Sequence, residues 1–482
     1  MRTELMRSLA EILPADAILS AKEELKPYEC DGLTAYRQLP WLVVLPQDEH
    51  QLKQLVKLCH SRKIPVVMRG AGTGLSGGAL PLENGLLVSL ARMNRILCLD
   101  PVNRVARVQP GVRNLAITEA ARSYGLYYAP DPSSQIACSI GGNVAENAGG
   151  IHCLKYGLTV NNVQGIKFLT MSGKEITLGG DCYDCPGYDL LALLHGSEGL
   201  LGIVTEVMVR LLPLPQETRT LMASFASVSA AAEAVAAVIR EGLIPAAMEM
   251  MDRPAIVAVE EYLHAGYPNS AQALVICDLD GPSEQVGEEL AKARRVMTEQ
   301  GAMEVRVARD ETERLRLWAG RKSAFPAIGR ITPDYYCMDG TIPRHRLAEV
   351  LSGIADLAGK YGLRVANVFH AGDGNIHPLI MYDSAKGELD KVETLGQEIL
   401  ELCIQVGGTI TGEHGVGVEK LDSMCQQFTE GELQLFHTIK RAFDPEGLLN
   451  PGKAVPTLSR CAELGGMHIH DGQLPFPELE RF

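Results

Sequence analysis

A glycine-rich loop near the start of the chain restricts the fold more than any other feature of this sequence. The stretch IPVVMRGAGTGLSGGALP (residues 64–81) follows a helical segment and contains the spacing Gly-x-Gly-x-x-Gly from Gly72 to Gly77. In a Rossmann fold, a helix must begin inside such a loop, because its N-terminus holds the pyrophosphate. Here Gly77 and Gly78 would weaken that helix and Pro81 would break it. We therefore expect no Rossmann NAD site.

The same loop is suited to a phosphate group without any helix. Its small residues let the backbone approach a ligand, and successive N–H groups can form an anion-binding nest. The hydroxyl groups of Thr73 and Ser76 add further donors. A tight connection within a sheet would use the glycines equally well, so the loop alone leaves both interpretations open.

Composition limits the class of protein. A chain of 482 residues is expected to form two or three domains. Its net charge of −14, without a cluster of Lys or Arg, argues against a nucleic-acid partner. The twelve cysteines lack regular spacing and the N-terminus lacks an apolar signal segment, which favours a cytoplasmic location. No uninterrupted apolar run reaches the length of a membrane span, so we expect membrane contact only indirectly, through a partner.

Patterning along the chain predicts an α+β protein. Apolar periodicity predicts a helix at 48–62, followed by short strands on either side of the glycine-rich loop. Pro213 and Pro215 indicate a domain boundary. Beyond them, helical patterns alternate with strands, as expected for a sheet covered by helices; these helices are predicted at 227–241, 284–300, 346–361 and 388–406. We therefore expect a first domain at 1–215, an α+β substrate or cap domain at 216–405, and a C-terminal segment at 406–482 that packs on the first domain and completes the active site.

A second group of residues has the composition of a metal site. NVFHAGDGNIHP places His370 and His377 around a glycine-rich turn, and TGEHGVG places Glu413 beside His414. Two imidazoles and a carboxylate can bind Zn²⁺ or another divalent ion and leave positions open for a substrate. Two core histidines near a turn are the alternative, but the flanking glycines favour a ligand site. Adjacent side chains on an extended segment point apart, so we assign Glu413 to the metal and His414 to proton transfer.

The order of RGAGTGLSGG, PDPSS and GGNVAENAGG resembles the FAD-binding domain of the vanillyl-alcohol-oxidase type, also called the PCMH type. The resemblance implies two small subdomains that hold an extended FAD, with the glycine-rich loop over the pyrophosphate. Thr73 stands where relatives that tether the flavin often carry a histidine, which implies non-covalent FAD. The resemblance implies contacts to FAD from Arg69, Gly70, Ala71, Gly72, Thr73, Gly74, Leu75, Ser76, Pro130, Asp131, Ser133, Gly141, Gly142, Asn143, Asn147, Gly202, Ile203 and Val204.

The segments around the histidines resemble the C-terminal half of the D-2-hydroxy-acid dehydrogenases. This resemblance implies that His370, His377 and Glu413 hold a divalent metal, Zn or Mn, and that His414 acts on the substrate. Arg321 in LWAGRKSAFPAIGR stands where that family places an arginine that binds the substrate carboxylate, although a solvated helix arginine would fit the spacing equally well. FDPEGLLNPGK resembles the family's closing segment and implies that Asn450 touches the flavin.

The family resemblance implies the oxidation of a small 2-hydroxy acid, either glycolate to glyoxylate or D-lactate to pyruvate. In that chemistry, metal-assisted removal of the hydroxyl proton accompanies hydride transfer to flavin N5. Because the chain has no four-cysteine iron–sulfur pattern, its electrons must pass to oxygen, a soluble acceptor or another subunit. The resemblance implies a complex with a second FAD-domain-like subunit and an iron–sulfur subunit, at the inner face of the cell membrane.

Three alternatives remain open at the level of sequence. The chain could be a stand-alone dehydrogenase of D-lactate or another D-2-hydroxy acid. It could be a metal-dependent hydrolase that uses the histidines and Glu413, although this leaves the first 215 residues unexplained. It could also be a flavin-binding scaffold without turnover of its own.

Overall fold

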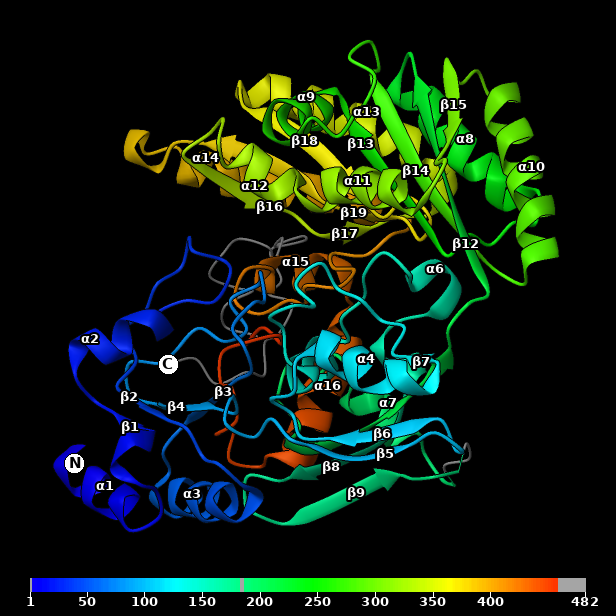
Figure 1. Ribbon diagram of the computed structural model, residues 1–482. Coiled ribbons are helices and arrows are strands. Elements are labelled where there is room, and N and C mark those ends of the chain that lie inside the picture. Colours follow the sequence, from blue (N-terminus) through cyan, green and yellow to red (C-terminus); the bar gives the residue numbers. More distant parts are fainter. Residues whose placement is uncertain (1, 183–185, 458–482) are drawn as a thin grey trace.

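The computed structural model describes residues 2–182 and 186–457, which form two lobes. Figure 1 shows the chain beginning in the lower lobe and entering the upper lobe with strand β12 (Glu217–Phe225). It returns through helix α15 (Leu421–Gln427) to helix α16 (Glu430–Phe443) in the lower lobe. The mixture of helices and sheets confirms the predicted α+β class.

The first sheet of the lower lobe carries the glycine-rich loop. Its strand order is β1-β2-β4-β3, in which β2, β4 and β3 are parallel; the bounds are β1 (Ile18–Leu19), β2 (Leu42–Val44), β4 (Leu86–Ser89) and β3 (Val66–Arg69). Helices α1 (Arg2–Ala10) and α3 (Glu49–Arg62) share a core with this sheet, and α2 (Lys22–Leu25) follows β1. Since α3 buries Leu52, Leu55, Val56 and Cys59, the predicted helix and its apolar face are confirmed.

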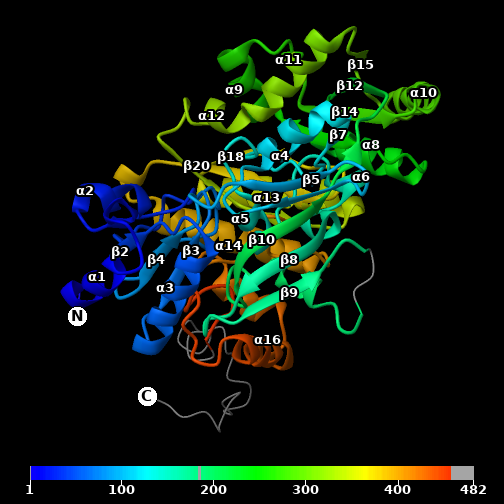
Figure 2. The ribbon, with the colours of Figure 1, turned by 60° about the horizontal axis from the view of Figure 1, so that its bottom comes forward.

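A second, antiparallel sheet completes the lower lobe. Its order is β5-β6-β10-β8-β9, with β5 (Ile96–Asp100), β6 (Val105–Val108), β10 (Ile203–Arg210), β8 (Val163–Leu169) and β9 (Glu175–Gly179). Figure 2 shows β10, β8 and β9 side by side. The connections carry α4 (Asn114–Ala121), β7 (Leu126–Tyr127), α5 (Ile140–Glu146), α6 (Cys153–Tyr156) and α7 (Leu190–Leu194), and β7 pairs with β11 (Leu212–Pro213).

The upper lobe is a seven-stranded antiparallel sheet with the order β15-β12-β14-β13-β18-β20-β16. The remaining strands are β15 (Glu304–Val307), β14 (Ala273–Gly281), β13 (Ala247–Asp252), β18 (Arg364–Phe369), β20 (Pro378–Tyr382) and β16 (Asp334–Cys337). A short pair, β17 (Gly340–Thr341) and β19 (Asn375–Ile376), lies between this sheet and the lower lobe.

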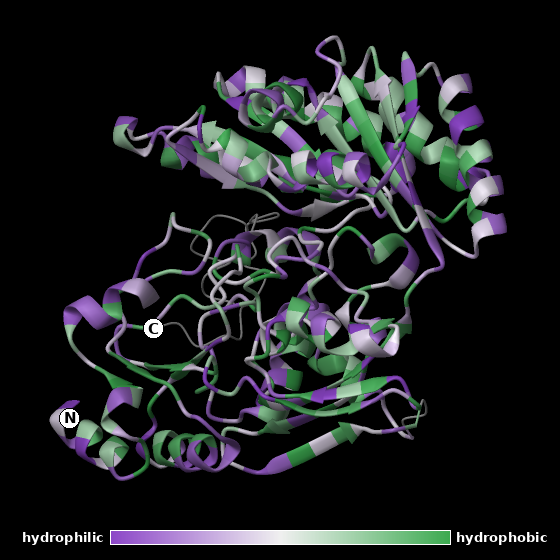
Figure 3. Ribbon diagram, viewed as in Figure 1, coloured by the Kyte–Doolittle hydropathy of each residue, from purple (hydrophilic) through white to green (hydrophobic). Residues whose placement is uncertain are grey.

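Helices cover both faces of the upper sheet. One core contains residues of α8 (Val228–Arg240), α10 (Ser283–Glu299), α13 (Leu347–Tyr361) and α14 (Leu389–Gln405). The core on the other face contains residues of α9 (Arg253–Leu263), α11 (Glu311–Lys322) and α12 (Ala324–Ile328). Figure 3 shows polar and apolar turns mixed along α10, as expected for a helix with one buried face. The four helices of the first core match the four that periodicity predicted.

The end of the described chain joins the first sheet. Leu449 pairs in parallel with Val66 of β3, and Leu448 and Leu449 lie in the core of that sheet. The ring of Phe443 lies 6.4 Å from that of Phe168 in the second sheet. The C-terminal segment therefore contacts both sheets of the lower lobe.

Two findings complete the fold. The passage around GGNVAENAGG has little regular periodicity in its sequence, yet it contains helix α5, which ends at Asn147 in the left-handed conformation (φ 54°). Its adjacent glycines conceal the helix because they carry no apolar periodicity. Among the described helices, none is long and apolar enough to cross a membrane.

Candidate active site

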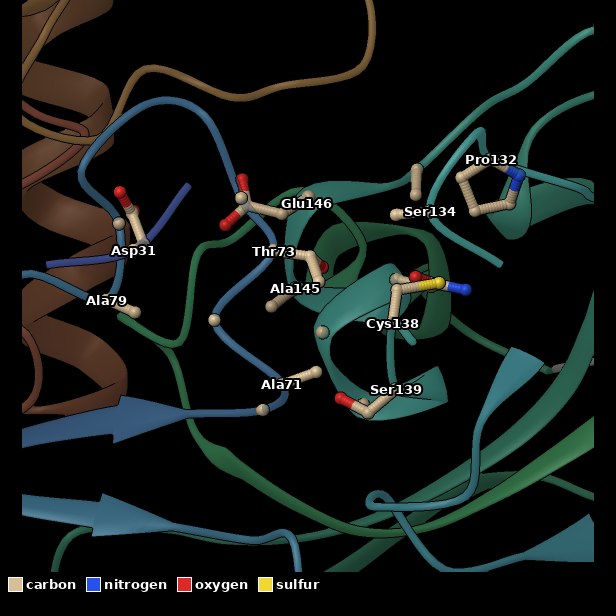
Figure 4. Close-up of a pocket in the computed structure, with 18 of the residues that line it drawn as sticks. Asp31, Ala71, Thr73, Ala79, Pro132, Ser134, Cys138, Ser139, Ala145 and Glu146 are labelled. Atoms are coloured by element: carbon tan, nitrogen blue, oxygen red, sulfur yellow. The ribbon is translucent and has the colours of Figure 1, made fainter. Parts of the chain in front are cut away.

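A cavity of about 390 Å³ brings together segments from both lobes and from both ends of the chain. Figure 4 shows part of its wall, where Ala71 and Thr73 of the glycine-rich loop face the segment that carries Cys138 and Ser139. Of the residues predicted from sequence, the wall contains Arg69, Gly70, Ala71, Gly72, Thr73, Gly74, Leu75, Ser133, Gly141, Gly142, Asn143, Gly202, Ile203, Val204, Arg321, His377, Glu413, His414 and Asn450.

Four of the predicted flavin contacts lie outside this wall and hold neighbouring loops. The carbonyl of Pro130 accepts a hydrogen bond from Asn114. Asp131 lies 2.8 Å from Nδ1 of His152. Asn147 ends helix α5 and accepts from the backbone of the next loop. The fourth, Ser76, is fully buried.

The glycine-rich loop leaves no room for side chains at two positions. Gly72 has a φ of +72°, and a Cβ there would lie 2.1 Å from Nη2 of Arg69. A Cβ on Gly70 would lie 2.3 Å from Oγ of Ser139, a buried hydroxyl without a protein partner. The loop backbone therefore packs closely against Arg69 and Ser139, and the Ser139 hydroxyl remains free to donate to a ligand. A phosphate site requires such free donors.

A second cavity of about 450 Å³ continues from the first. Both walls include Gly70, Ala71 and Ser139, and the second adds Asn94 and Arg113. The two cavities therefore lie next to each other along this part of the glycine-rich loop. Sequence reasoning missed Asn94 and Arg113, because neither lies in a glycine-rich motif.

The histidines and the glutamate converge at the cavity wall, which includes His377 and Glu413. The ligand atoms of His370, His377 and Glu413 all lie within 4.8 Å of one another. Oε1 of Glu413 lies 3.4 Å from Nε2 of His370 and 3.2 Å from Nε2 of His377. Both Nε2 atoms and Oε2 of Glu413 are buried without a hydrogen-bond partner. Two unsatisfied imidazole nitrogens beside a buried carboxylate fit a divalent metal ion. A second group, Cys337 with His377 and His414, shares one of these histidines.

Charges within this group are strongly coupled. Burial alone would raise the pKa of Glu413, but the two imidazoles outweigh it and hold that pKa well below its usual range. Burial opposes protonation of His370, but carboxylates on both sides raise its pKa well above the usual value. One of these carboxylates is Glu413 and the other is Glu249.

Glu249 is a site residue that sequence reasoning missed. It lies in β13 and is 1% exposed. Its Oε1 lies 2.7 Å from Nδ1 of His370, and its Oε2 accepts from Nε of Arg321 at 2.8 Å. The predicted substrate-binding arginine is thus a buried, paired residue at the end of α11, and its side chain still reaches the cavity wall. An acidic residue in the middle of the apolar strand AMEMMD was the available signal.

A second buried carboxylate, Asp339, orders the loop that carries Glu413 and His414. Its Oδ2 accepts from the backbone N–H groups of Gly412 and His414, each at 3.0 Å. Lys420 lies 3.2 Å from the same oxygen. Although burial would raise the pKa of Asp339, Lys420 and neighbouring histidines hold it well below its usual value. The ionised carboxylate therefore fixes the start of this loop.

His414 lies in the cavity wall as a neutral imidazole. Its ring stacks on that of His377, with centroids 5.0 Å apart and an angle of 12° between the planes. Nδ1 is enclosed without a partner. Burial lowers the pKa of His414 to about 4, so the imidazole is neutral near pH 7.

Glu198 and Asn450 secure the other side of the loop. The carboxylate of Glu198 accepts from the backbone of Val416 and Gly417, both at 2.7 Å. Its own carbonyl accepts from Nδ2 of Asn450 at 2.6 Å. Both residues have left-handed backbones, with φ of 49° and 43°. Strain of this kind at two contacting residues of a cavity wall is typical of functional sites.

Two family models match the chain. The FAD binding domain matches residues 40–179, and the C-terminal domain of FAD linked oxidases matches residues 214–454. The second match alone spans half of the chain. The chain belongs to the FAD-linked oxidase family. Together with the glycolate oxidase relatives described below, these matches make this FAD-linked oxidase an FAD-dependent hydroxy-acid oxidoreductase, as the resemblance implied.

Curated relatives of this FAD-linked oxidase agree in length with the chain. Glycolate oxidase subunit GlcD of Escherichia coli K12 is 60% identical over 482 residues, which cover 100% of this chain and 97% of the relative. GlcD of Bacillus subtilis is 40% identical, and the match covers 88% of this chain and 91% of the relative. D-lactate dehydrogenase of Anaerostipes hadrus is 32% identical, and the match covers 93% of this chain and 97% of the relative.

Solved structures confirm the predicted vanillyl-alcohol-oxidase-type fold of this FAD-linked oxidase. p-Cresol methylhydroxylase with bound substrate superposes with a TM-score of 0.78 and 18% identity, over 95% of this chain and 97% of that one. Alkyldihydroxyacetonephosphate synthase superposes with a TM-score of 0.73 and 19% identity, over 93% and 85%. At such identities the likeness concerns the fold alone.

Proposed function

We propose that this FAD-linked oxidase converts glycolate to glyoxylate. The observation that carries the proposal is that one cavity wall contains the glycine-rich loop together with Arg321, His377, Glu413 and His414. The site can thus hold a cofactor and an oxidisable acid side by side. The identity of 60% with a glycolate oxidase subunit supports glycolate as the acid.

We propose that FAD is held without a covalent bond by the wall residues that the glycine-rich loop, the α5 region and the 202–204 segment supply. The close backbone around Gly70 and Gly72 and the unsatisfied Ser139 support this placement. When bound, FAD supplies the two-electron oxidant that accepts a hydride at N5. Asn450, which also braces Glu198, would hold the C-terminal segment against it.

We propose that His370, His377 and Glu413 hold a divalent metal, Zn or Mn. Their unsatisfied, buried ligand atoms support this proposal. The ion would supply a Lewis acid that makes the substrate hydroxyl easier to deprotonate.

We propose that side chains of the cavity wall carry out substrate binding and proton transfer. Arg321 would bind the substrate carboxylate and orient the acid in the cavity. His414 would accept the hydroxyl proton. Because Nδ1 of His414 is enclosed by protein, we propose that Nε2 is the atom that accepts the substrate's hydroxyl proton. The enclosed position of these groups would keep competing water away from the proton transfer.

We propose the division predicted from sequence, with an FAD-binding domain at 1–215, a cap domain at 216–405 and a closing segment at 406–482. The change of sheet between β11 and β12 supports the first boundary. The contacts of Phe443 and Leu449 with the lower lobe support the role of the closing segment. Residues 458–482 of this segment lie outside the described residues.

We also propose that the chain is the catalytic subunit of a complex with a second FAD-domain-like subunit and an iron–sulfur subunit, located at the inner face of the cytoplasmic membrane. Support comes from the GlcD relatives, which are named as subunits of glycolate oxidase. A stand-alone D-lactate dehydrogenase is the second candidate, favoured by the relative from Anaerostipes hadrus.

The test is an anaerobic visible spectrum of the purified protein before and after addition of glycolate, and separately of D-lactate. We expect an oxidised flavin band that glycolate bleaches faster than D-lactate does. Preference for D-lactate would support the second candidate. A flavin band that neither acid bleaches, with FAD and Zn²⁺ or Mn²⁺ supplied, would contradict both.

A further inference from the structure

One buried carboxylate joins the two groups that the proposed function assigns to the substrate. Glu249 lies in the middle of β13, and its two oxygens have different partners. Oε1 lies 2.7 Å from Nδ1 of His370, just beyond the end of β18. Oε2 lies 2.8 Å from Nε and 2.6 Å from Nη2 of Arg321, in the last turn of α11. All three side chains are at most 3% exposed.

We propose that Glu249 is the positioning residue for both halves of the substrate site. It sets the tautomer of His370 for metal binding and it aims Arg321 at the substrate carboxylate. This inference rests on the proposed roles of His370 and Arg321, and it adds a residue that touches neither the metal nor the substrate.

The contact with His370 decides which ring nitrogen can bind a metal. A neutral imidazole has one N–H and one lone pair. When a metal displaces the proton from Nε2, the hydrogen bond from Nδ1 to Oε1 of Glu249 keeps the remaining proton on Nδ1 and leaves the lone pair on Nε2 for the metal. Nε2 is the atom that faces Glu413, at 3.4 Å. Without the carboxylate, the proton could occupy Nε2 and block the ligand position.

The contact with Arg321 decides which part of the guanidinium is available. Nε and Nη2 both contact Glu249. Among the described residues, Nη1 makes no hydrogen bond, so this nitrogen is left for the cavity, whose wall includes Arg321. A buried guanidinium without a counter-charge would be strongly unfavourable, so Glu249 also keeps Arg321 inside the protein.

The substitution Glu249→Gln tests both contacts with almost no change in volume. An amide has one acceptor oxygen, whereas the carboxylate uses two. If that oxygen stays with the arginine, the amide NH₂ faces Nδ1 of His370, which must then become an acceptor. The proton of His370 moves to Nε2, and metal binding is weakened.

The experiment uses the full-length FAD-loaded protein, stripped of metal with a chelator and titrated with Zn²⁺ alone. We expect Glu249→Gln to raise the Kd for Zn²⁺ about 10- to 100-fold. With Zn²⁺ at saturation, we expect the KM for glycolate to rise about tenfold, since Arg321 is no longer fixed. The flavin spectrum and FAD content should stay unchanged, which a general loss of structure would not allow.

The matched control is Glu313→Gln. Glu313 is also buried and lies on α11, but its carboxylate accepts from Arg309 and lies outside the cavity wall. We expect it to leave Zn²⁺ affinity and KM unchanged. If Glu249→Gln does not fold, Glu249→Asp replaces it, because the shorter chain cannot reach both partners, and the same loss of Zn²⁺ affinity or rise in KM is expected.

The outcomes separate the two proposals. If the unmodified protein binds Zn²⁺ and a folded Glu249 variant keeps native Zn²⁺ affinity and native KM, the positioning role of Glu249 is overturned. If the unmodified protein binds neither Zn²⁺ nor Mn²⁺, the metal part of the proposed function fails first. If Glu313→Gln lowers Zn²⁺ affinity as much as Glu249→Gln does, the inference is also overturned. The loss would then be a general effect of removing a buried charge.

Discussion

At the scale of single residues, buried carboxylates order the candidate site. Glu249 joins His370 to Arg321, and Asp339 gathers the backbone of the loop before His414. Glu198 holds the same loop from the far side. Each carboxylate accepts hydrogen bonds from another segment of the chain. These bonds offset the free-energy cost of removing the carboxylate from water. We therefore assign these residues to positioning and not to the chemical steps.

His414→Ala tests the assigned base. We expect FAD content and spectrum to remain native, while the rate of flavin reduction by glycolate falls about 10²- to 10⁴-fold, the usual contribution of a general base. Anaerobic stopped-flow spectroscopy measures this rate. His345→Ala is the control, because His345 is exposed and lies outside the cavity wall. A rate for His414→Ala near the native one would show that another group takes the proton.

Sequence reasoning found the site residues that lie in local motifs. The glycine-rich loop, the two histidines and Glu413 are recognisable because each motif is a short run of unusual residues. Glu249 and Asp339 each stand alone among apolar or small neighbours. Their roles depend on partners far away in the chain, and no local spacing encodes such contacts. The local signal was an acid inside an apolar strand, for Glu249, and an acid just after one, for Asp339.

At the scale of elements, the starts of the long helices were predictable from apolar periodicity. Asp48 caps α3 and Ser227 caps α8, and both helices begin within two residues of the predicted position. The short helix α5 was missed, because two glycines interrupt it and packing against the second sheet's core holds it instead. Long amphipathic helices are specified locally, and short buried ones are specified by what surrounds them.

Asp310→Ala is a test at this scale. Asp310 caps α11, the helix that carries Arg321 at its other end, and its Oδ1 accepts from the backbone of Glu313. Losing the cap costs about 1 kcal/mol, so amide exchange in the first turn of α11 should become about fivefold faster. Hydrogen-exchange mass spectrometry measures this rate. Asp310→Asn retains a capping oxygen and should exchange at nearly the native rate, and equal acceleration in both variants would argue against the cap.

At the scale of the whole molecule, one ligand should stabilise segments that are distant in sequence. The cavity wall includes residues of the glycine-rich loop, Gly202–Val204 and Asn450. FAD at about 100 times its Kd stabilises the folded state by about 2.7 kcal/mol. We therefore expect amides near all three segments to exchange up to about 100-fold more slowly in FAD-loaded protein than in apoprotein, with α10 unchanged. Protection confined to residues 40–179 would contradict an FAD site that spans the lower lobe.

The pairing of Val66 with Leu449 has a consequence for biosynthesis. A ribosome releases the N-terminal half of this chain long before it adds the strand-like segment that borders β3. The nascent first sheet therefore has an unpaired edge at β3, and Asn450 can join the cavity wall only after the whole upper lobe has been made. The wall around the cofactor can therefore be completed only after the C-terminal segment has been made.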